Sequence, residues 1–416
     1  MSNRTPPSAA RDPKPGVSMD RRRFVGGALA AAAAAPFLGI SVRVADQEAK
    51  RKVRLGVVGN GGRGGWIAKL FQKHGGYEMH AVADYFQAVA DKCGDALGVD
   101  KARRFPGLSG YRKLIDSGVE AIALENIPCF FPEQAAAAVA AGLHVYMAKP
   151  VAVDVPGTLA IGELGRQSTK KNRVFLVDYQ MPTDPAHIEI LKRIREGGLG
   201  KMAQVHTIGF TNAFPDPPVQ ATIENRMQGL MWVNDTALGC DYVGNYDIHA
   251  IDTAVWVIGQ RPLAAMGASR VCRADPHGDA RDVCSVVFEY ADGLVHNHLG
   301  QALANNNDGI LDCRVHGTKA NAALSYWGKA FIRGGDKHYV GKVENLYEAG
   351  AVRNIAAFHQ NITEGKFENE TALRSVDSTL AVILAREAGL RHGRLTMEEL
   401  IKENKKLAVD LTGLKA

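Results

Sequence analysis

The segment Val53-Arg54-Leu55-Gly56-Val57-Val58-Gly59-Asn60-Gly61-Gly62-Arg63-Gly64 decides the fold of this 416-residue chain. An apolar strand, 53–58, runs into a glycine-rich turn of the form GxGxxG. A helix pattern follows over 66–74, and a second apolar run over 79–84 ends at an acidic residue. This order of elements predicts a dinucleotide-binding βαβ unit, and a glycine-rich turn in another kind of α/β protein is the alternative.

Each glycine of the turn has a physical role in such a unit. Gly59 permits the tight turn, Gly61 lets the backbone approach a pyrophosphate, and Gly64 lets the helix pack on the sheet. Free N–H groups at the helix N-terminus then face the phosphates. We therefore expect the whole turn to bind the cofactor: Gly59, Asn60, Gly61, Gly62, Arg63 and Gly64.

Asp84 and Tyr85 indicate which nicotinamide cofactor the turn would bind. A carboxylate at Asp84 can accept hydrogen bonds from the adenosine ribose hydroxyls and would repel a 2′-phosphate. The next residue is Tyr85 rather than an arginine that could hold such a phosphate. The sequence therefore favours NAD over NADP.

Strands and helices alternate as far as a strand at 174–177, which predicts a parallel sheet covered on both faces. Longer strands follow, at 202–210, 264–270, 282–290, 293–300, 310–316 and 321–326. They predict an open, mostly antiparallel sheet with helices on one face. We expect an α/β protein with an N-terminal Rossmann parallel sheet and a C-terminal α/β domain built on a large open sheet.

The same rhythm divides the chain into three segments. We expect a leader and linker over 1–45, a cofactor-binding domain over 46–178 and a substrate-binding and oligomerisation domain over 179–416. Within the last segment, Ala291-Asp292-Gly293 reads as a hairpin turn, and 371–408 reads as helical.

The leader carries the pattern of a twin-arginine export signal. Asp20-Arg21-Arg22-Arg23-Phe24-Val25 precedes a mildly apolar stretch over 25–40, so we expect export to the periplasm by the twin-arginine machinery. An uncleaved membrane anchor is the alternative, although the stretch is short for a span. An exported enzyme cannot draw on the cytoplasmic nicotinamide pool, so we expect a tightly held cofactor.

The charge and the cysteines exclude some classes of function. Residues 1–45 hold seven Lys or Arg and two acidic residues, a net of +5, so the remainder of the +6 chain is near +1. The sequence has no basic patch with interleaved aromatic residues, so we do not expect nucleic acid as a partner. The six cysteines are scattered, and no His, Cys, Asp or Glu spacing indicates a metal site. His296 and His298 share one strand face, which could meet the cleft, a subunit contact or solvent.

Two further segments resemble the glucose–fructose oxidoreductase, inositol dehydrogenase and rhizopine-catabolism (Gfo/Idh/MocA) family. They are Gly142-Leu143-His144-Val145-Tyr146-Met147-Ala148-Lys149-Pro150 and Asn245-Tyr246-Asp247-Ile248-His249-Ala250-Ile251-Asp252. Order and spacing match over about residues 50–400. The resemblance implies a Rossmann domain, a second domain whose open sheet serves a dimer or tetramer, and NAD(P)-linked chemistry at a carbinol carbon of a sugar or polyol.

The resemblance also implies the catalytic residues. Lys149 falls where the family has a lysine beside the nicotinamide, and His249 matches the histidine that takes or orients the hydroxyl proton. On a helix, Asn245 would share a face with His249, and Asp252 could fix the imidazole tautomer. Asn126 and Pro128 fall in the turn that contacts the cofactor in this family. Without the resemblance, a core histidine would be the simpler reading of His249.

The chain departs from the family pattern at several of these positions. Ala148 stands where a glutamate usually precedes the lysine, and Asn245 stands where an aspartate is common. Asp247 replaces a small residue, and helical geometry turns it roughly 160° away from His249 unless the helix begins after it. The turn at 127–132 also lacks the family's histidine. We include Asn245 and Asp247 among the candidate catalytic residues.

Three functions remain open on the sequence. The first is an NAD-dependent oxidoreductase of a sugar, polyol or glycoside that retains its cofactor. The second is a redox-neutral glycosidase that oxidises C3 transiently, eliminates the aglycone and reduces the ketone back, with an extra base from the Asn245 and Asp247 region. The third is a non-catalytic sugar- or cofactor-binding protein, against which the presence of Lys149 argues.

Overall fold

The computed structural model describes residues 51–416, so the predicted export signal lies outside the described residues. Two sheets organise this part of the chain. None of its helices is both long enough and apolar enough to cross a membrane.

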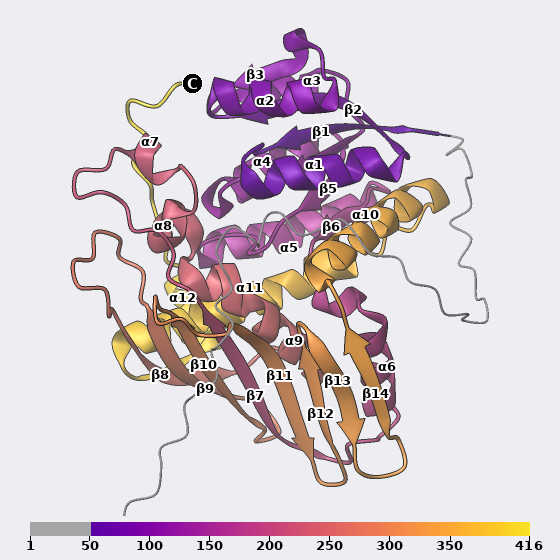
Figure 1. The fold of residues 1–416 in the computed structure, drawn as a ribbon, viewed down its shortest axis with the longest axis vertical. Coiled ribbons are helices and arrows are strands. Elements are labelled where there is room, and N and C mark those ends of the chain that lie inside the picture. The colour runs from indigo at the N-terminus through magenta and orange to yellow at the C-terminus, as the bar shows by residue number, and fades with distance from the viewer. Residues whose placement is uncertain (1–50) are drawn as a thin grey trace, which may run out of the picture. The chain divides into compact units, whose positions relative to one another are not determined.

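The first sheet has six parallel strands with the order of a Rossmann fold (Figure 1). Its strands, in spatial order, are β3 (Arg104–Pro106), β2 (Tyr77–Asp84), β1 (Val53–Val58), β4 (Ala121–Leu124), β5 (His144–Met147) and β6 (Phe175–Val177). The connecting helices are α1 (Gly62–His74), α2 (Gln87–Leu97), α3 (Gly110–Asp116), α4 (Phe131–Ala140) and α5 (Val155–Lys170). The predicted parallel sheet is confirmed.

Alternate residues of these strands feed two separate cores, one on each face of the sheet. Leu55 and Val57 of β1 pack with α1 and α2, whereas Val58 packs on the side of α3, α4 and α5. Helix α10 (Leu346–Glu364), from the far end of the chain, joins the first of these cores through Ala351 and Phe358. The face behind the glycine turn is therefore completed by the C-terminal half of the chain.

The second sheet has nine strands, of which only β7 and β10 pair in parallel. Its order is β14 (Tyr339–Val343), β13 (Gly328–Arg333), β12 (Asn321–Ser325), β11 (Ile310–Gly317), β7 (Met202–Thr211), β10 (Val295–Ala302), β9 (Val283–Glu289), β8 (Ala264–Arg270) and β15 (Arg394–Thr396). One face packs against α6 (Pro185–Arg195), α9 (Ile248–Ile258) and α11 (Glu370–Arg391). The predicted open, mostly antiparallel sheet is confirmed, as is the hairpin at Gly293, whose φ is +77°.

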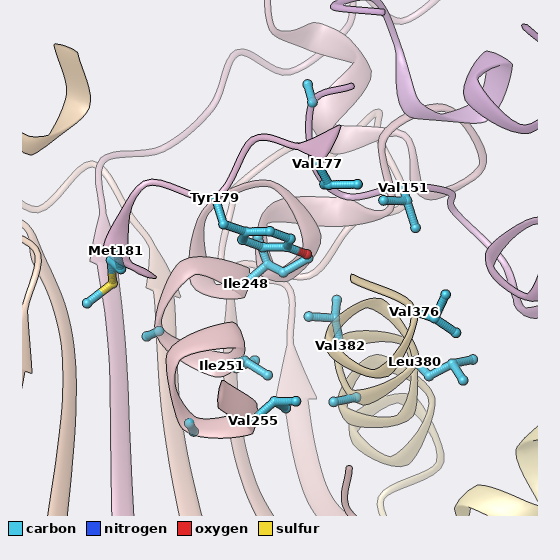
Figure 2. Packing of buried hydrophobic residues seen from close by; sticks show 14 of the residues in the cluster. Val151, Val177, Tyr179, Met181, Ile248, Ile251, Val255, Val376, Leu380 and Val382 are labelled. Carbon is cyan, nitrogen blue, oxygen red and sulfur yellow. The ribbon is translucent and has the colours of Figure 1, made fainter. Parts of the chain in front are cut away.

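The helix α9 carries the candidate histidine, and packing against α11 fixes it in place. Ile251 and Val255 of α9 lie on the side of Val382 of α11, and Tyr179, just after β6, packs over Ile248 (Figure 2). Every residue of α9 except Trp256 and Ile258 is buried. The position of His249 is therefore set by a dense apolar core rather than by a surface helix.

The sequence prediction was wrong for the last part of the chain. The expected helix over 371–408 is two helices, α11 and α12 (Met397–Glu403), with strand β15 between them. The first helix ends because His392 adopts a left-handed conformation, with φ of +51°. The second begins at a capping box in which Thr396 and Glu399 bond reciprocally. Helix α10 and strands β13 and β14 were also not predicted.

Candidate cofactor-binding and active site

The glycine turn has the tight geometry that the sequence predicted. Gly59 has a φ of +83°, and a side chain there would meet the backbone of Asn126 at 2.5 Å. A side chain on Gly64 would collide with the carbonyl of Gly59, so the first turn of α1 lies directly on the strand end. At Gly61, by contrast, a side chain would meet nothing within 4 Å. The turn is closed against the protein and open on the side where a phosphate would bind.

Asp84 is fixed by backbone amides from both sides. Its Oδ2 accepts a hydrogen bond from Asn60 N at 2.7 Å, and its Oδ1 accepts one from Phe86 N at 3.0 Å. Burial raises the pKa of Asp84, and the two amide hydrogen bonds oppose that shift. The next residue, Tyr85, donates from its hydroxyl to Glu224 at 2.5 Å. The carboxylate is therefore held rigidly beside the glycine turn.

Charged side chains gather at the carboxyl ends of the parallel strands. Asp84 ends β2, Glu125 follows β4, Lys149 follows β5 and Asp178 follows β6. In open α/β sheets, ligands bind outside this edge. The pairing of β4 with β5 sets Glu125 across from Ala148, whose amide donates to Leu124 O. Glu125, after the neighbouring strand, thus places a carboxylate across from Ala148, where the family usually has a glutamate.

Arg63 joins two of these carboxylates. Its guanidinium bonds to Asp178, and its Nε lies 3.3 Å from Glu125 Oε2. It also lies over the rings of Trp66 and Tyr347, at 5.6 and 5.2 Å from their centroids. Burial lowers the pKa of Arg63, but the Asp178 and Glu125 carboxylates outweigh it, so the net shift is upward. Arg63, predicted as part of a phosphate turn, is the centre of a buried ionic cluster.

Lys149 is held next to this cluster. Its Nζ donates to the backbone carbonyl of Asn245. Burial and then the nearby Arg63 charge lower the pKa of Lys149 to about 7, against the opposing effect of Asp178 and Glu125. Burial likewise raises the pKa of Glu125 to about 7, with Arg63 opposing the shift. The amine is therefore poised to take up or release a proton near neutral pH.

His249 occupies the first turn of α9 and stays neutral. It is 9 % exposed, and burial, followed by the Lys149 and Arg63 charges, lowers its pKa well below the usual value. Its Nδ1 has no partner among the described residues. Asp252, predicted to fix this ring, bonds instead to Arg374 and Ser378, so that prediction was wrong.

Asn245 and Asp247 lie on a π-helical turn, Val243–Asp247, and not on the predicted α-helix. Asn245 therefore contributes its carbonyl to Lys149. Asp247 is fully buried and faces the second sheet, where its Oδ2 lies 3.0 Å from His298 Nε2. The prediction of Asp247 as a catalytic residue is not supported, because the turn directs it away from Lys149. His298 and His296 are also fully buried, rather than at a cleft or surface.

Two strained residues precede the π turn, and no pattern in the sequence indicates them. Cys240 and Asp241 both have left-handed backbones, with φ of +70° and +71°. The Asp241 carboxylate accepts from Val243 N at 2.6 Å, which anchors the start of the turn. Cys240 in turn accepts from buried Arg386 at 3.4 Å. Strain of this kind is typical of functional sites, and here it sets the path of the chain toward Lys149.

The remaining predicted residues lie beside the glycine turn. Asn126 packs against Gly59, and its Oδ1 is buried without a partner in the described part of the chain. Pro128 is buried at the start of the short helix Pro128–Phe130. Glu125 and Asp178 were missed, although each directly follows a short, fully buried strand. That position alone could have identified them.

Two distant segments cover the Asp84 side of the edge. Glu224, in α7 (Ile223–Arg226), accepts from the Tyr85 hydroxyl, and the same hydroxyl accepts from Lys415 N at 3.2 Å. Leu414, from the C-terminal tail, packs in a small cluster with Tyr85 and Phe86. The tail over 407–416 therefore runs back from the second sheet to the Rossmann sheet.

Comparison with known proteins places these features in context. Residues 187–323 match the GFO/IDH/MocA C-terminal domain. A curated relative, inositol 2-dehydrogenase 3 of Saccharopolyspora erythraea, is 28 % identical over 214 residues. That match covers 51 % of this chain and 56 % of the relative, so it spans about half the length of each protein.

Solved structures share the fold over 83 % of this chain. An inositol dehydrogenase homologue from Azotobacter vinelandii, complexed with NAD+, has a TM-score of 0.69 with 18 % identity and is covered over 98 % of its length. Aldose-aldose oxidoreductase from Caulobacter crescentus, complexed with glycerol, has a TM-score of 0.66 with 19 % identity and is covered over 100 % of its length. A levoglucosan dehydrogenase, in complex with NADH and levoglucosan, has a TM-score of 0.68 with 16 % identity and is covered over 100 % of its length.

Proposed function

The chain belongs to the Gfo/Idh/MocA family, and on that premise we propose that it is an NAD-dependent oxidoreductase acting at a carbinol carbon of a sugar, polyol or glycoside. The observation that carries this proposal is Lys149, with a pKa of about 7, beside neutral His249 at the edge of the sheet that bears the glycine turn. Relatives of the same fold are named as enzymes of inositol, levoglucosan and aldoses.

The residues of the glycine turn fit the cofactor. Gly61 leaves open space for a pyrophosphate, and the fixed Asp84 carboxylate would accept the ribose hydroxyls and exclude a 2′-phosphate. NAD, when bound, supplies the hydride acceptor. The buried Oδ1 of Asn126, which has no partner among the described residues, lies next to this turn and would accept a donor from the cofactor.

The proton in this reaction is handled by the chain itself. With a pKa near 7, Lys149 is partly neutral at neutral pH and can take the hydroxyl proton as hydride leaves the carbinol carbon. His249, held neutral, can accept a hydrogen bond from the same hydroxyl and orient it. Arg63 and Glu125 act through Lys149, because their charges move its pKa in opposite directions.

The experiment that tests this function is a substrate panel read by NADH formation. Purified protein with NAD+ is mixed with inositols, free aldoses, anhydrosugars and alditols, and the absorbance of NADH is followed. We expect NADH to form with at least one carbinol substrate, up to one equivalent per chain while the cofactor stays bound, and the corresponding ketone or lactone to form in equal amount. The absence of NADH with every member, in protein that binds NAD, would contradict a net dehydrogenase.

A redox-neutral glycosidase is the second candidate. Elimination after oxidation at C3 needs a further base near C2, and buried Asp247 does not supply it, because it faces His298. Glu125 is the observation that favours this function, since it is a carboxylate next to Lys149 with a pKa of about 7. Aryl glycosides in the same panel distinguish the two functions, because aglycone release without net NADH is specific to the glycosidase.

We further propose that the cofactor is retained between turnovers, with a second, carbonyl substrate taking the hydride back from bound NADH, and that the C-terminal tail over 407–416 contributes to this retention. The tail contacts Tyr85, directly after Asp84, and it is anchored by Leu407 N, which donates to Asp154 Oδ2 at 2.9 Å. Deleting the tail should speed NAD dissociation by about tenfold, which corresponds to roughly 1.4 kcal/mol of lost binding. Dissociation is measured by exchange of bound NAD against a fluorescent analogue.

The control for this prediction is Thr412→Ala, an exposed position in the intact tail, which should leave the exchange rate unchanged. Equal exchange rates for the full chain and the tail deletion would refute the role of the tail.

Export remains a proposal that rests on the leader alone. Replacing Arg21 and Arg22 by lysine should abolish transport, because twin-arginine signals require the arginine pair. Arg23→Lys, which leaves that pair intact, is the matched control. The readout is the share of full-length and processed protein in the periplasmic fraction, and unchanged export of the double variant would exclude this route.

We also propose that the chain forms a dimer or tetramer through the uncovered face of the nine-stranded sheet. Large apolar side chains stand exposed on this sheet, among them Met266, Val295 and Leu299. Light scattering of the purified protein should give the mass of two or four chains, and Leu299→Arg should reduce it. A monomer at micromolar concentration would contradict the proposal.

A further inference from the structure

A cluster of metal-binding side chains lies behind the candidate active site. Asp247 from the π turn, Cys284 from β9 and His298 from β10 offer ligand atoms that all lie within 4.8 Å of one another. All three residues are buried. They come from segments far apart in the sequence, which is why spacing alone predicted no metal site.

The carboxylate of Asp247 is incompletely satisfied. Its only partner among the described residues is His298, and its Oδ1 is buried without any hydrogen bond. The hydroxyl of Tyr242, also fully buried, has no partner in the described part of the chain either. Burying a carboxylate without a cation is costly, so these atoms point to a group that the protein itself does not provide.

Two facing glycines make room for this cluster. Gly300 of β10 pairs with Gly209 of β7. A side chain on Gly300 would approach Cys284 Sγ and the Tyr242 oxygen at 2.9 Å each, and it would overlap the Asp247 carboxylate. A side chain on Gly209 would overlap the same carboxylate. The two glycines, on adjacent strands, therefore let the Asp247 carboxylate lie directly against the sheet, beside Cys284 and Tyr242.

A hydrogen-bonded chain orients His298 from its other side. Its Nδ1 lies 2.9 Å from Thr207 Oγ1, which lies 2.7 Å from His296 Nε2, and His296 Nδ1 lies 3.3 Å from the Tyr290 hydroxyl. Thr207 has a single proton, so the chain runs in one of two directions. If Nδ1 of His298 donates to Thr207, its Nε2 carries no proton and offers a lone pair toward Asp247. Metal-binding histidines commonly have this arrangement, in which the second ring nitrogen donates to a neighbour and fixes the tautomer.

We propose that Asp247, Cys284 and His298 bind a zinc ion, with the Tyr242 oxygen bordering the fourth position. A thiolate, an imidazole and a carboxylate form a donor set typical of zinc, which prefers four nitrogen, sulfur or oxygen ligands. Binding would release the Cys284 thiol proton and any proton shared between Asp247 and His298. The site is closed to solvent, so the ion is structural.

A bound ion would hold the π turn in place through Asp247. Asp247 ends that turn, two residues after the Asn245 carbonyl that accepts from Lys149 and two before His249. An ion held between this turn and the strands β9 and β10 would fix both elements of the candidate site at once. The ion would do this whichever reaction the site performs.

The first test is metal content and cobalt substitution in the full chain. Protein purified without added metal should carry about one zinc per chain. After exchange with Co2+, it should show the near-ultraviolet thiolate-to-cobalt charge-transfer band. Cys284→Ser should lose both the zinc and the band, whereas Cys313→Ser, at an equally buried cysteine on β11, should keep both.

A chelator test remains decisive if the Cys284→Ser variant does not fold. Removing the ion from the wild-type chain should lower its unfolding temperature by about 5 °C or more, reversibly on adding zinc. Wild-type protein that carries no metal and shows neither a cobalt–thiolate band nor a zinc-dependent unfolding temperature would overturn the proposal. The hydrogen-bonded chain would then run the other way, with His298 Nε2 donating to Asp247.

Discussion

Replacing Lys149 with alanine should lower kcat by about 10²- to 10⁴-fold while leaving NAD bound, because general-base catalysis is lost and the phosphate-binding turn is untouched. The lysine contacts the Asn245 carbonyl, whereas the glycine turn and Asp84 lie on other strand ends. Turnover is measured with the substrate found in the panel, and bound NAD is measured after denaturing the protein.

The matched control for this prediction is Lys171→Ala. Lys171 caps the C-terminal end of α5 and also donates to a backbone carbonyl, that of Val139, at 2.8 Å, but it lies away from the candidate site. Its loss should leave kcat unchanged. If Lys149→Ala kept full turnover, or if it lost its cofactor along with its activity, the assignment of Lys149 as the base would be wrong.

The second large effect concerns the pH dependence of kcat. Because Lys149 must be neutral to accept a proton, kcat of the wild-type enzyme should rise as pH increases through about 7. Arg63 lowers the pKa of Lys149 and Glu125 raises it. Arg63→Gln should therefore move this rise to higher pH, and Glu125→Gln should move it to lower pH, each by roughly one unit.

The two variants should also differ in stability. Arg63→Gln leaves the Glu125 and Asp178 carboxylates buried without their cation and should cost about 3–5 kcal/mol of unfolding free energy. Glu125→Gln keeps the shape of the side chain and leaves Arg63 paired with Asp178, so its cost should be smaller. The measurements are pH profiles of kcat and denaturant unfolding. Shifts of the two profiles in the same direction would refute the electrostatic coupling.

Local patterns made the geometry of the glycine turn and the position of Asp84 predictable from sequence. Gly59, Gly64 and Asp84 perform roles set by the backbone within one βαβ unit, and the structure has the geometry that their spacing predicted. Lys149 was found through a family resemblance, since a lysine after a strand has no meaning by itself. The Rossmann sheet and the open sheet followed in the same way from the change in strand length and rhythm.

The site features that the sequence did not predict depend on contacts between distant segments. The pairing of Arg63 with Asp178 joins residues 115 positions apart, and no spacing rule reveals it. Asp247 was placed on an α-helix, but a π-helical turn rotates it toward His298 on β10. The same turn brings the Asn245 carbonyl, rather than its side chain, to Lys149. Irregular backbone at this site decided which atoms meet.

The most direct test of the proposed chemistry is to measure hydride transfer to the bound cofactor in protein purified after export. Protein purified from the periplasmic fraction without added cofactor should release about one NAD or NADH per chain when denatured. Mixed with its substrate in a single turnover, the intact protein should convert bound NAD to NADH, transiently for a glycosidase and lastingly for a dehydrogenase. Substrate turnover at an unchanged rate in protein stripped of NAD, or in Lys149→Ala, would contradict the assignment.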